Sequence, residues 1–254
     1  MTDLVDSTAV GAADGLRAPA APAPDVHDAG AHASMLNRLR AAVLGANDGI
    51  ISTAGLVMGV AGATTDSFAL AAAGIAGLVA GALSMAAGEY VSVSAQRDSE
   101  RALLARKASD LRAMPEAELG QLAHLLRGRG LSEATAHEAA VELTRHDALG
   151  AHAELELRLD PDELTSPWQA AVSSLLSFAV GALIPLLAMV LAPSGVRVPV
   201  TGIAVVAALF LTGYLSARAG DAPVARAIVR NIAGGVLAMT ITFAVGTLVG
   251  TQIG

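Results

Sequence analysis

Two carboxylates lie inside long apolar segments of the sequence, and they are the residues that most directly suggest chemistry. Asp48 lies in the apolar segment 41–63, and Glu89 lies in the apolar segment 68–95. A carboxylate at the centre of a bilayer costs about 2.5–3.5 kcal/mol, so such residues usually face a polar pathway or a partner. Neither segment contains Lys or Arg to neutralise the charge. The alternative for both acids is a position near a helix end, where the side chain reaches water.

A methionine precedes the second carboxylate by one helical turn. Gly77, Gly81, Met85 and Glu89 are spaced four residues apart, so a helix places them on one face. The two glycines allow close approach of another helix. Carboxylate oxygens together with a thioether suit Fe²⁺ or Mn²⁺ better than Mg²⁺ or Ca²⁺. Core packing is the alternative role for Met85.

The elements that carry these residues are predicted to be membrane helices. The chain has 254 residues, of which 54% are hydrophobic and 15% charged, whereas soluble proteins carry about 25% charge. A membrane span needs roughly 20 apolar residues. Five segments qualify: 41–63, 68–95, 168–191, 198–217 and 232–253. The predicted fold class is therefore all-α, a polytopic membrane protein with five transmembrane helices.

The polar segments divide the chain further. Residues 1–35 are predicted to be a disordered tail, 36–96 to hold the first two spans, 97–166 to be a helical insert and 167–254 to hold the last three spans. No Gly or Pro separates the second span from the start of the insert, so one helix is expected to continue to about Arg112. Pro115 suits the first turn of the next helix, Gly130 suits a helix end and Ser132 is a candidate N-cap.

Basic residues predict the orientation of the spans. With the N-terminus in the cytoplasm, Arg197 is the single one of the 16 Lys and Arg residues that falls outside. This places the insert in the cytoplasm and the C-terminus outside. No targeting segment is evident, and the expected location is a bacterial plasma membrane. The chain has no cysteine, and its net charge of −7 gives no indication of nucleic-acid binding.

Three segments resemble those of the vacuolar iron transporter (VIT) family. They are LRAAVLGANDGIISTAGLVMGVAGA in the first span, GALSMAAGEYVSVSAQRDSE in the second, and PWQAAVSSLLSFAVGALIPLL after the insert. The similarity covers about residues 36–252. It implies a five-span homodimer that exports Fe²⁺, and often Mn²⁺, from the cytosol in exchange for protons. No permanently bound cofactor is implied, and the metal is the transported ion.

The resemblance also implies roles for individual residues. Asp48 and Met85 match pathway residues at the family's dimer interface, and Glu89 matches the acid of its GEY motif. The family has a metal-binding domain in the insert, whose ligand positions correspond to or lie near acids of this chain. These acids are Glu100, Asp110, Glu116, Glu118 and Glu156.

Two insert positions depart from the family pattern. Lys107 and Gln121 stand where family members commonly have Glu, so weak binding of divalent cations is expected. Restoring glutamate at both positions should tighten that binding.

Other function classes fit less well. A ferritin-like enzyme would need Glu-x-x-His pairs, and none occurs. A membrane hydrolase would need a nucleophile with a base, but the spans offer serines without His and the sequence has no G-x-S-x-G motif. The chain is therefore not expected to be an enzyme. The remaining alternative is a membrane-anchored metal sensor or scaffold that does not transport, which would have no need for Asp48 within the bilayer.

Overall fold

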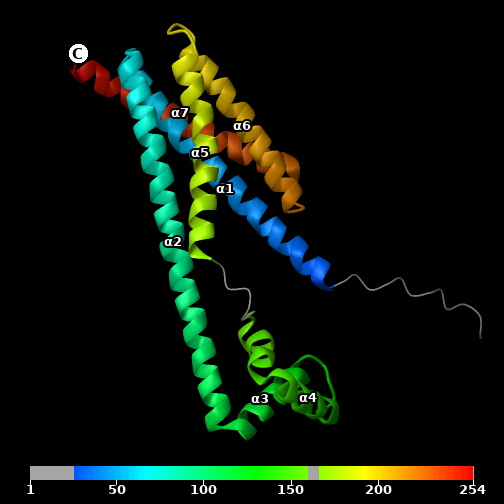
Figure 1. The fold of residues 1–254 in the computed structure, drawn as a ribbon. Helices are drawn as coiled ribbons and strands as arrows, with labels where there is room; N and C mark the ends of the chain where they lie inside the picture. The colour runs from blue at the N-terminus through cyan, green and yellow to red at the C-terminus, as the bar shows by residue number, and fades with distance from the viewer. Residues whose placement is uncertain (1–25, 160–165, 254) are drawn as a thin grey trace, which may run out of the picture. The chain divides into compact units, whose positions relative to one another are not determined.

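The computed structural model describes residues 26–159 and 166–253, and every regular element in these ranges is helical. The elements in chain order are α1 (Val26–Ala63), α2 (Ser67–Ala113), α3 (Pro115–Gly128), α4 (Glu133–His152), the π-helical turn η1 (Ala153–Leu157), α5 (Pro167–Leu191), α6 (Arg197–Ala219) and α7 (Val224–Ile253) (Figure 1). The predicted all-α class is confirmed.

The predicted tail falls mostly outside the described residues, because nothing before residue 26 is described. α1 begins at Val26, before the position where the sequence predicts the first membrane segment to start. Contacts divide the chain after Arg38, so the start of α1 belongs to one unit. The rest of α1 and helices α2–α7 belong to the other.

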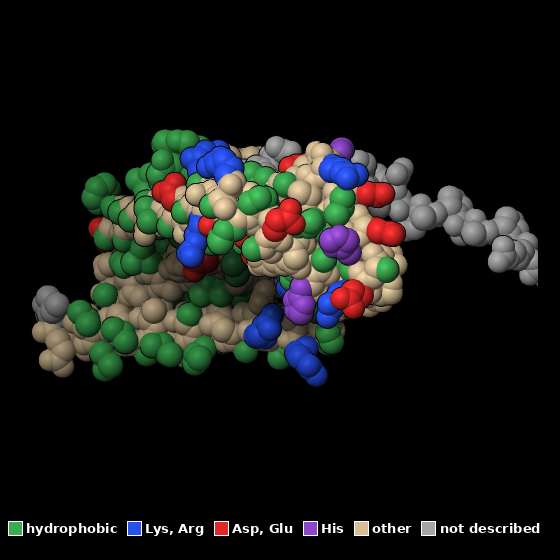
Figure 2. Space-filling view, turned by 90° about the horizontal axis from the view of Figure 1, so that it is seen from below, with side chains coloured by type: hydrophobic (Ala, Val, Ile, Leu, Met, Phe, Trp, Pro, Cys, Tyr) green, Lys and Arg blue, Asp and Glu red, His purple; other side chains and the backbone are tan. Residues whose placement is uncertain are grey.

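Five described helices are long and apolar enough to cross a membrane. They are Ala42–Ala63 within α1, then α2, α5, α6 and Val224–Gln252 within α7. Large apolar side chains lie on their surfaces, including Phe68 at 79%, Leu191 at 76% and Ile203 at 71% exposure. Figure 2 shows hydrophobic side chains along the helices, and many of the charged and histidine side chains gathered on the part of the chain nearest the viewer. Such apolar surfaces mark membrane contact, and the five predicted spans are confirmed as candidate spans.

The second span continues without a break into the insert. α2 has 47 residues, a length of about 70 Å at 1.5 Å per residue, whereas a bilayer core is about 30 Å thick. Its start is capped by Asp66, which accepts hydrogen bonds from the amides of Phe68 and Ala69. The helix ends at Ala113, and Pro115 opens α3. The predicted continuous helix is confirmed, and α2 joins the membrane part of the chain to the insert.

The insert has a small apolar core of its own. The side chain of Ser132 accepts a hydrogen bond from the Thr135 amide, as its predicted N-cap role requires. Gly130 has a φ of +100°, a conformation that favours glycine and ends the helical course after α3. The buried side chains that join α3 to α4 are Leu122, Leu126, Ala136, Ala140 and Ala151. These contacts hold the helices that carry the insert's polar residues.

Glycines allow α1 to lie directly against α5 and α7. A Cβ on Gly49 would overlap the backbone of α5, and one on Gly181 of α5 would overlap the carbonyl oxygen of Ala46. Near the other end of α1, a Cβ on Gly246 of α7 would overlap the carbonyl oxygen of Gly59. Contacts of this kind suit membrane helices, in which close backbone packing drives association. They fix the position of α1 and therefore of Asp48.

Replacing Gly181 with alanine is expected to destabilise the protein by about 2 kcal/mol, the usual size of an overpacking effect. The new methyl group would meet backbone rather than a side chain that could move. Thermal unfolding in detergent measures the effect. Gly202→Ala in α6 is the matched control, because no atom lies within 4 Å of its added Cβ. Equal melting temperatures for both variants would contradict the close α1–α5 contact.

Candidate functional site

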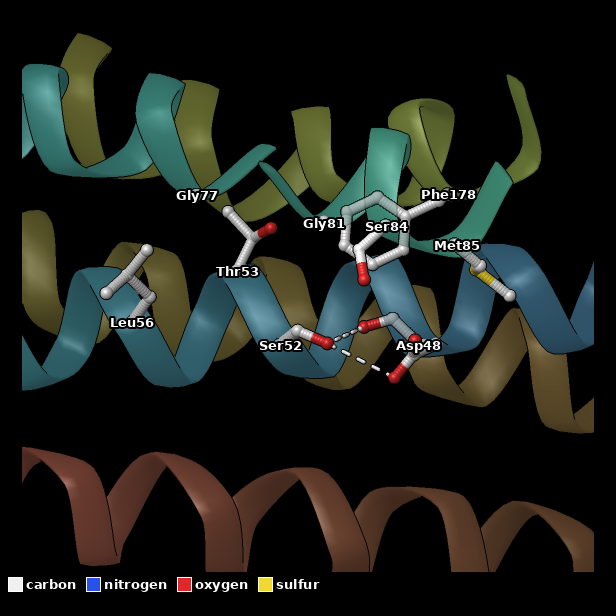
Figure 3. Close-up of a pocket in the computed structure, with 9 residues that line it drawn as sticks. All are labelled: Asp48, Ser52, Thr53, Leu56, Gly77, Gly81, Ser84, Met85 and Phe178. Carbon is white, nitrogen blue, oxygen red and sulfur yellow. Dashed lines mark hydrogen bonds between the residues drawn. The ribbon is translucent and has the colours of Figure 1, made fainter. Parts of the chain in front are cut away.

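A cavity of about 310 Å³ lies between the first two spans. Its lining residues are Asp48, Ser52, Thr53, Leu56, Gly77, Gly81, Ser84, Met85 and Phe178. Figure 3 shows Asp48, Ser52 and Leu56 along α1, and Gly77, Gly81 and Met85 along α2. The structure therefore brings together two of the three predicted pathway residues, Asp48 and Met85.

Asp48 presents its carboxylate at the surface of the single chain. The residue is exposed although it lies within a candidate span. The Ser52 hydroxyl, one turn further along α1, donates to the backbone carbonyl of Asp48 and lies 3.2 Å from its Oδ1. No cation is within ion-pairing distance of Asp48 among the described residues. The carboxylate is thus available to a ligand that enters the cavity.

Met85 lies partly buried at the edge of an apolar cluster formed by Ala82, Phe178 and Ala182. The Phe178 ring fills the space where a Cβ on Gly81 would lie, so the predicted glycine stripe on α2 is used for close packing. The thioether therefore has packing contacts as well as a place in the cavity lining.

Glu89 follows Met85 by one turn of α2 but does not line the cavity. Its side chain is exposed. The stripe predicted from the sequence thus divides into Gly77, Gly81 and Met85 at the cavity, and Glu89 beyond it.

Three hydroxyl groups at the cavity were missed from the sequence. Ser52, Thr53 and Ser84 line it beside the predicted residues. Thr53 is 2% exposed, and its hydroxyl has no hydrogen-bond partner among the described residues. Ser52 could have been found from its position four residues after Asp48, which a helix places on the same face. These oxygens add ligands of the type that divalent cations accept.

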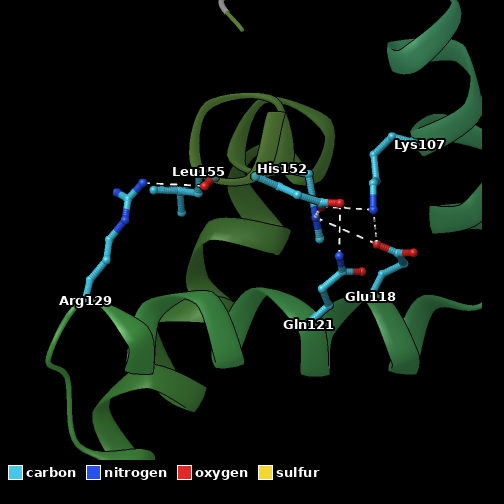
Figure 4. A network of polar contacts seen from close by, with 7 residues as sticks. Lys107, Glu118, Gln121, Arg129, His152 and Leu155 are labelled. Atoms are coloured by element: carbon cyan, nitrogen blue, oxygen red, sulfur yellow. Dashed lines mark hydrogen bonds and ion pairs between the residues drawn. The ribbon is translucent and has the colours of Figure 1, made fainter. Parts of the chain in front are cut away.

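A second polar centre lies within the insert. The Lys107 ammonium is 2.9 Å from Glu118 Oε2 and 2.9 Å from Glu156 Oε2. His152 Nδ1 is 2.8 Å from Glu156 Oε2, and Gln121 Nε2 donates to Glu156 Oε1 at 2.9 Å. Figure 4 shows Lys107, Glu118, Gln121 and His152 converging from several helices. Lys107 and Gln121 thus face the acids that the sequence proposes as ligands.

The insert centre contains part of the predicted ligand set. Glu118, His152 and Glu156 offer ligand atoms that lie within 4.8 Å of one another. Glu100, Asp110 and Glu116 do not join this group in the part of the chain that the structure describes. Glu100 instead accepts a hydrogen bond from Gln96, and Glu116 is exposed in the first turn of α3. His152 was missed, although its spacing of four residues from Glu156 places both on one helical face.

The contacts at the insert centre favour the charged form of Glu156. Burial alone would raise the pKa of Glu156, but the hydrogen bonds from His152 and Lys107 and the charge of Lys107 outweigh it. The pKa of Glu156 therefore lies below its ordinary value of 4.5. In the folded protein this carboxylate holds its proton less strongly than in the unfolded chain.

This lowered pKa predicts the pH dependence of the insert's stability. The stabilisation from Glu156 should be complete above pH 4.5 and should be lost as the pH falls through the lower pKa of the folded state. Amide hydrogen exchange of α3, corrected for the intrinsic exchange rate, measures the loss. Glu133→Gln is the matched control and should keep the pH dependence of the wild type, because Glu133 is exposed and pairs with Arg127 only at 3.9 Å. Protection in α3 that is unchanged well below pH 4.5 would contradict the pairing of Glu156.

Comparisons with known proteins place the chain among relatives. Residues 39–247 match the VIT family. Vacuolar iron transporter homolog 4 of Arabidopsis thaliana is 38% identical over 215 residues, which cover 84% of this chain and 85% of the relative. Vacuolar iron transporter of Acanthamoeba castellanii is 38% identical over 83% of this chain and 78% of its own. Vacuolar iron transporter homolog 1 of Oryza sativa is 40% identical over 84% of this chain and 74% of its own. The family match spans both the cavity at Asp48 and the insert, and the chain belongs to the VIT family.

Proposed function

We propose that the protein transports divalent metal, moving Fe²⁺ and also Mn²⁺ out of the cytosol in exchange for protons. Its relatives are named iron transporters, and metal transport is the function that an intramembrane carboxylate in a cavity supports best. The observation that carries the proposal is Asp48, an exposed carboxylate beside a polar cavity within a candidate span.

The chemistry of the cavity supports a transition metal as the substrate. Its polar lining combines a carboxylate, three hydroxyl groups and a thioether. Oxygen ligands suit Mn²⁺ and Fe²⁺, and the softer sulfur of Met85 favours Fe²⁺. Glu89, one turn beyond Met85, would receive the cation or a proton at the mouth of the same pathway.

A homodimer would complete the pathway. α2 leaves most of its apolar surface uncovered, since only 17% of its most apolar window is buried within one chain. Lipid could cover Ile75, Val79 and Leu83, which lie on that face, but it could not solvate the Asp48 carboxylate. A second copy that covers the cavity would enclose the Asp48 carboxylates of both copies in one polar pathway.

The distribution of basic residues supports an orientation with the N-terminus and the insert in the cytoplasm and the C-terminus outside. We place the protein in a bacterial plasma membrane, with export to the outside. The insert would then meet cytosolic metal. Its acids, among them Glu100, Asp110 and Glu116, would attract divalent cations, and the pair Glu118 and Glu156 would form its centre.

Metal flux into proteoliposomes tests this function against a sensor or scaffold. Purified protein is reconstituted, and Fe²⁺ and Mn²⁺ flux are measured with and without a pH gradient. Transport should exceed that of protein-free vesicles and should increase when protons can move in the opposite direction. Metal binding without any flux would favour the sensor or scaffold instead.

A further inference from the structure

We infer that the Lys107 ammonium takes the place of a divalent cation at the centre of the insert and holds the insert together without metal. The inference rests on the proposed function, in which the insert serves cation binding. It assigns Lys107 a role as a built-in counter-ion, which a transported ion would have to displace.

The distances leave one position for one cation. The Lys107 nitrogen is 2.9 Å from an oxygen of Glu118 and 2.9 Å from an oxygen of Glu156. A divalent cation would bind those same oxygens at about 2.0–2.6 Å and would therefore lie in the same gap between them. The ammonium and a metal bound to both carboxylates exclude one another.

The carboxylate oxygens that would otherwise bind a metal accept hydrogen bonds from neighbouring side chains instead. Glu156 accepts from Lys107, His152 and Gln121, and Glu118 accepts from Lys107. Lys107 is 7% exposed and Glu118 is 5% exposed, so water does little to screen their charges. Buried charges persist when they are paired and hydrogen-bonded, and this cluster meets that condition with its own side chains.

The residues come from separate elements, which gives the contact a mechanical consequence. Lys107 belongs to α2, Glu118 to α3 and Glu156 to η1. The α2 helix also carries Met85 and Glu89. A metal would tie these elements together only while bound, whereas Lys107 ties them at all times. The insert should therefore keep one arrangement whether or not metal is present.

Removing the ammonium should uncover a metal site. Lys107→Leu leaves Glu118, Glu156 and His152 with ligand atoms within 4.8 Å of one another. The buried Glu118 and the partly buried Glu156 destabilise the metal-free insert when they lack their cation, and a bound divalent ion would replace the missing charge. Affinity for Mn²⁺ should rise about 10- to 1,000-fold, the range by which one neighbouring charge changes proton binding at such distances.

Mn²⁺ binding to the full chain in detergent tests the inference. Electron paramagnetic resonance of free Mn²⁺ counts the bound ions in the wild type, Lys107→Leu, Lys107→Arg and the double variant Lys107→Leu/Glu118→Gln. Lys107→Leu should gain a site that the double variant lacks, and Lys107→Arg, which keeps the positive charge, should gain none. An unchanged affinity in a folded Lys107→Leu variant would overturn the inference.

A measurement on the wild type keeps the inference testable even if Lys107→Leu does not fold. Amide hydrogen exchange of residues 115–128 and 153–157 should be the same with and without Mn²⁺. Protection that increases with Mn²⁺ in these segments would overturn the inference but leave transport intact. Absence of Fe²⁺ flux in proteoliposomes would instead contradict the proposed function and leave the role of Lys107 standing.

Discussion

Replacing Asp48 with asparagine is expected to lower Fe²⁺ flux by about 100-fold. The change keeps the shape of the side chain and removes its charge, so a cation in the cavity loses its one carboxylate ligand from α1. A contact to a charged group is worth roughly 1.5–3 kcal/mol, and each 1.36 kcal/mol corresponds to a factor of ten in rate. Asp48→Ala, which also removes the oxygens, should abolish flux.

Folding should survive both substitutions. Among the described residues Asp48 makes no ion pair, and its one side-chain hydrogen bond is to the Ser52 hydroxyl at 3.2 Å. Size-exclusion chromatography and thermal unfolding would verify that the variants remain folded. Asp98→Asn is the matched control, because Asp98 is an exposed acid on α2 outside the cavity. Wild-type flux in Asp48→Asn would remove Asp48 from the pathway.

Met85→Leu should reduce Fe²⁺ flux more than Mn²⁺ flux. Leucine keeps most of the volume and the apolar contacts with the cluster of Ala82 and Phe178, so stability should change by less than about 1.5 kcal/mol. It removes the sulfur, on which Fe²⁺ depends more than the harder Mn²⁺. The Fe²⁺/Mn²⁺ flux ratio at matched protein levels is the measurement. An unchanged ratio would leave Met85 with its packing role alone.

Glu89→Gln provides a contrasting result on the same helix. Glu89 lies outside the cavity and is exposed, so its loss should lower the flux of both metals without changing their ratio. If the carboxylate also carries protons, the dependence of flux on the pH gradient should weaken. Full flux with an intact response to the gradient would place Glu89 outside the pathway.

Local rules were sufficient to predict the helices of this chain. The absence of Gly and Pro after Glu89 predicted the continuous α2, Pro115 predicted the start of α3, and Ser132 predicted the cap of α4. Each of these features depends on residues that are close in the sequence. The five apolar segments likewise follow from composition and length alone.

The insert centre depended on contacts that no local rule contains. Gln121 and Glu156 are 35 residues apart, and Lys107 reaches both Glu118 and Glu156 from another helix. The sequence could identify Lys107 as a departure from the family pattern but could not place its ammonium between two acids. The way in which α2, α3 and η1 pack against one another decides this placement. The same packing keeps Glu100 and Asp110 out of the cluster that was predicted to include them.

Labelling of a single cysteine tests most directly whether Fe²⁺ enters the cavity at Asp48. The chain contains no cysteine, so Ser84→Cys introduces one thiol into the cavity lining. Its reaction with a maleimide is followed under anaerobic conditions with and without Fe²⁺, with Ser99→Cys on the exposed part of α2 as the control. Fe²⁺ should slow labelling of Ser84→Cys, should leave Ser99→Cys unaffected, and should give no protection when Asp48→Asn is added. Equal labelling rates with and without Fe²⁺ at Ser84→Cys would contradict a metal pathway through this cavity.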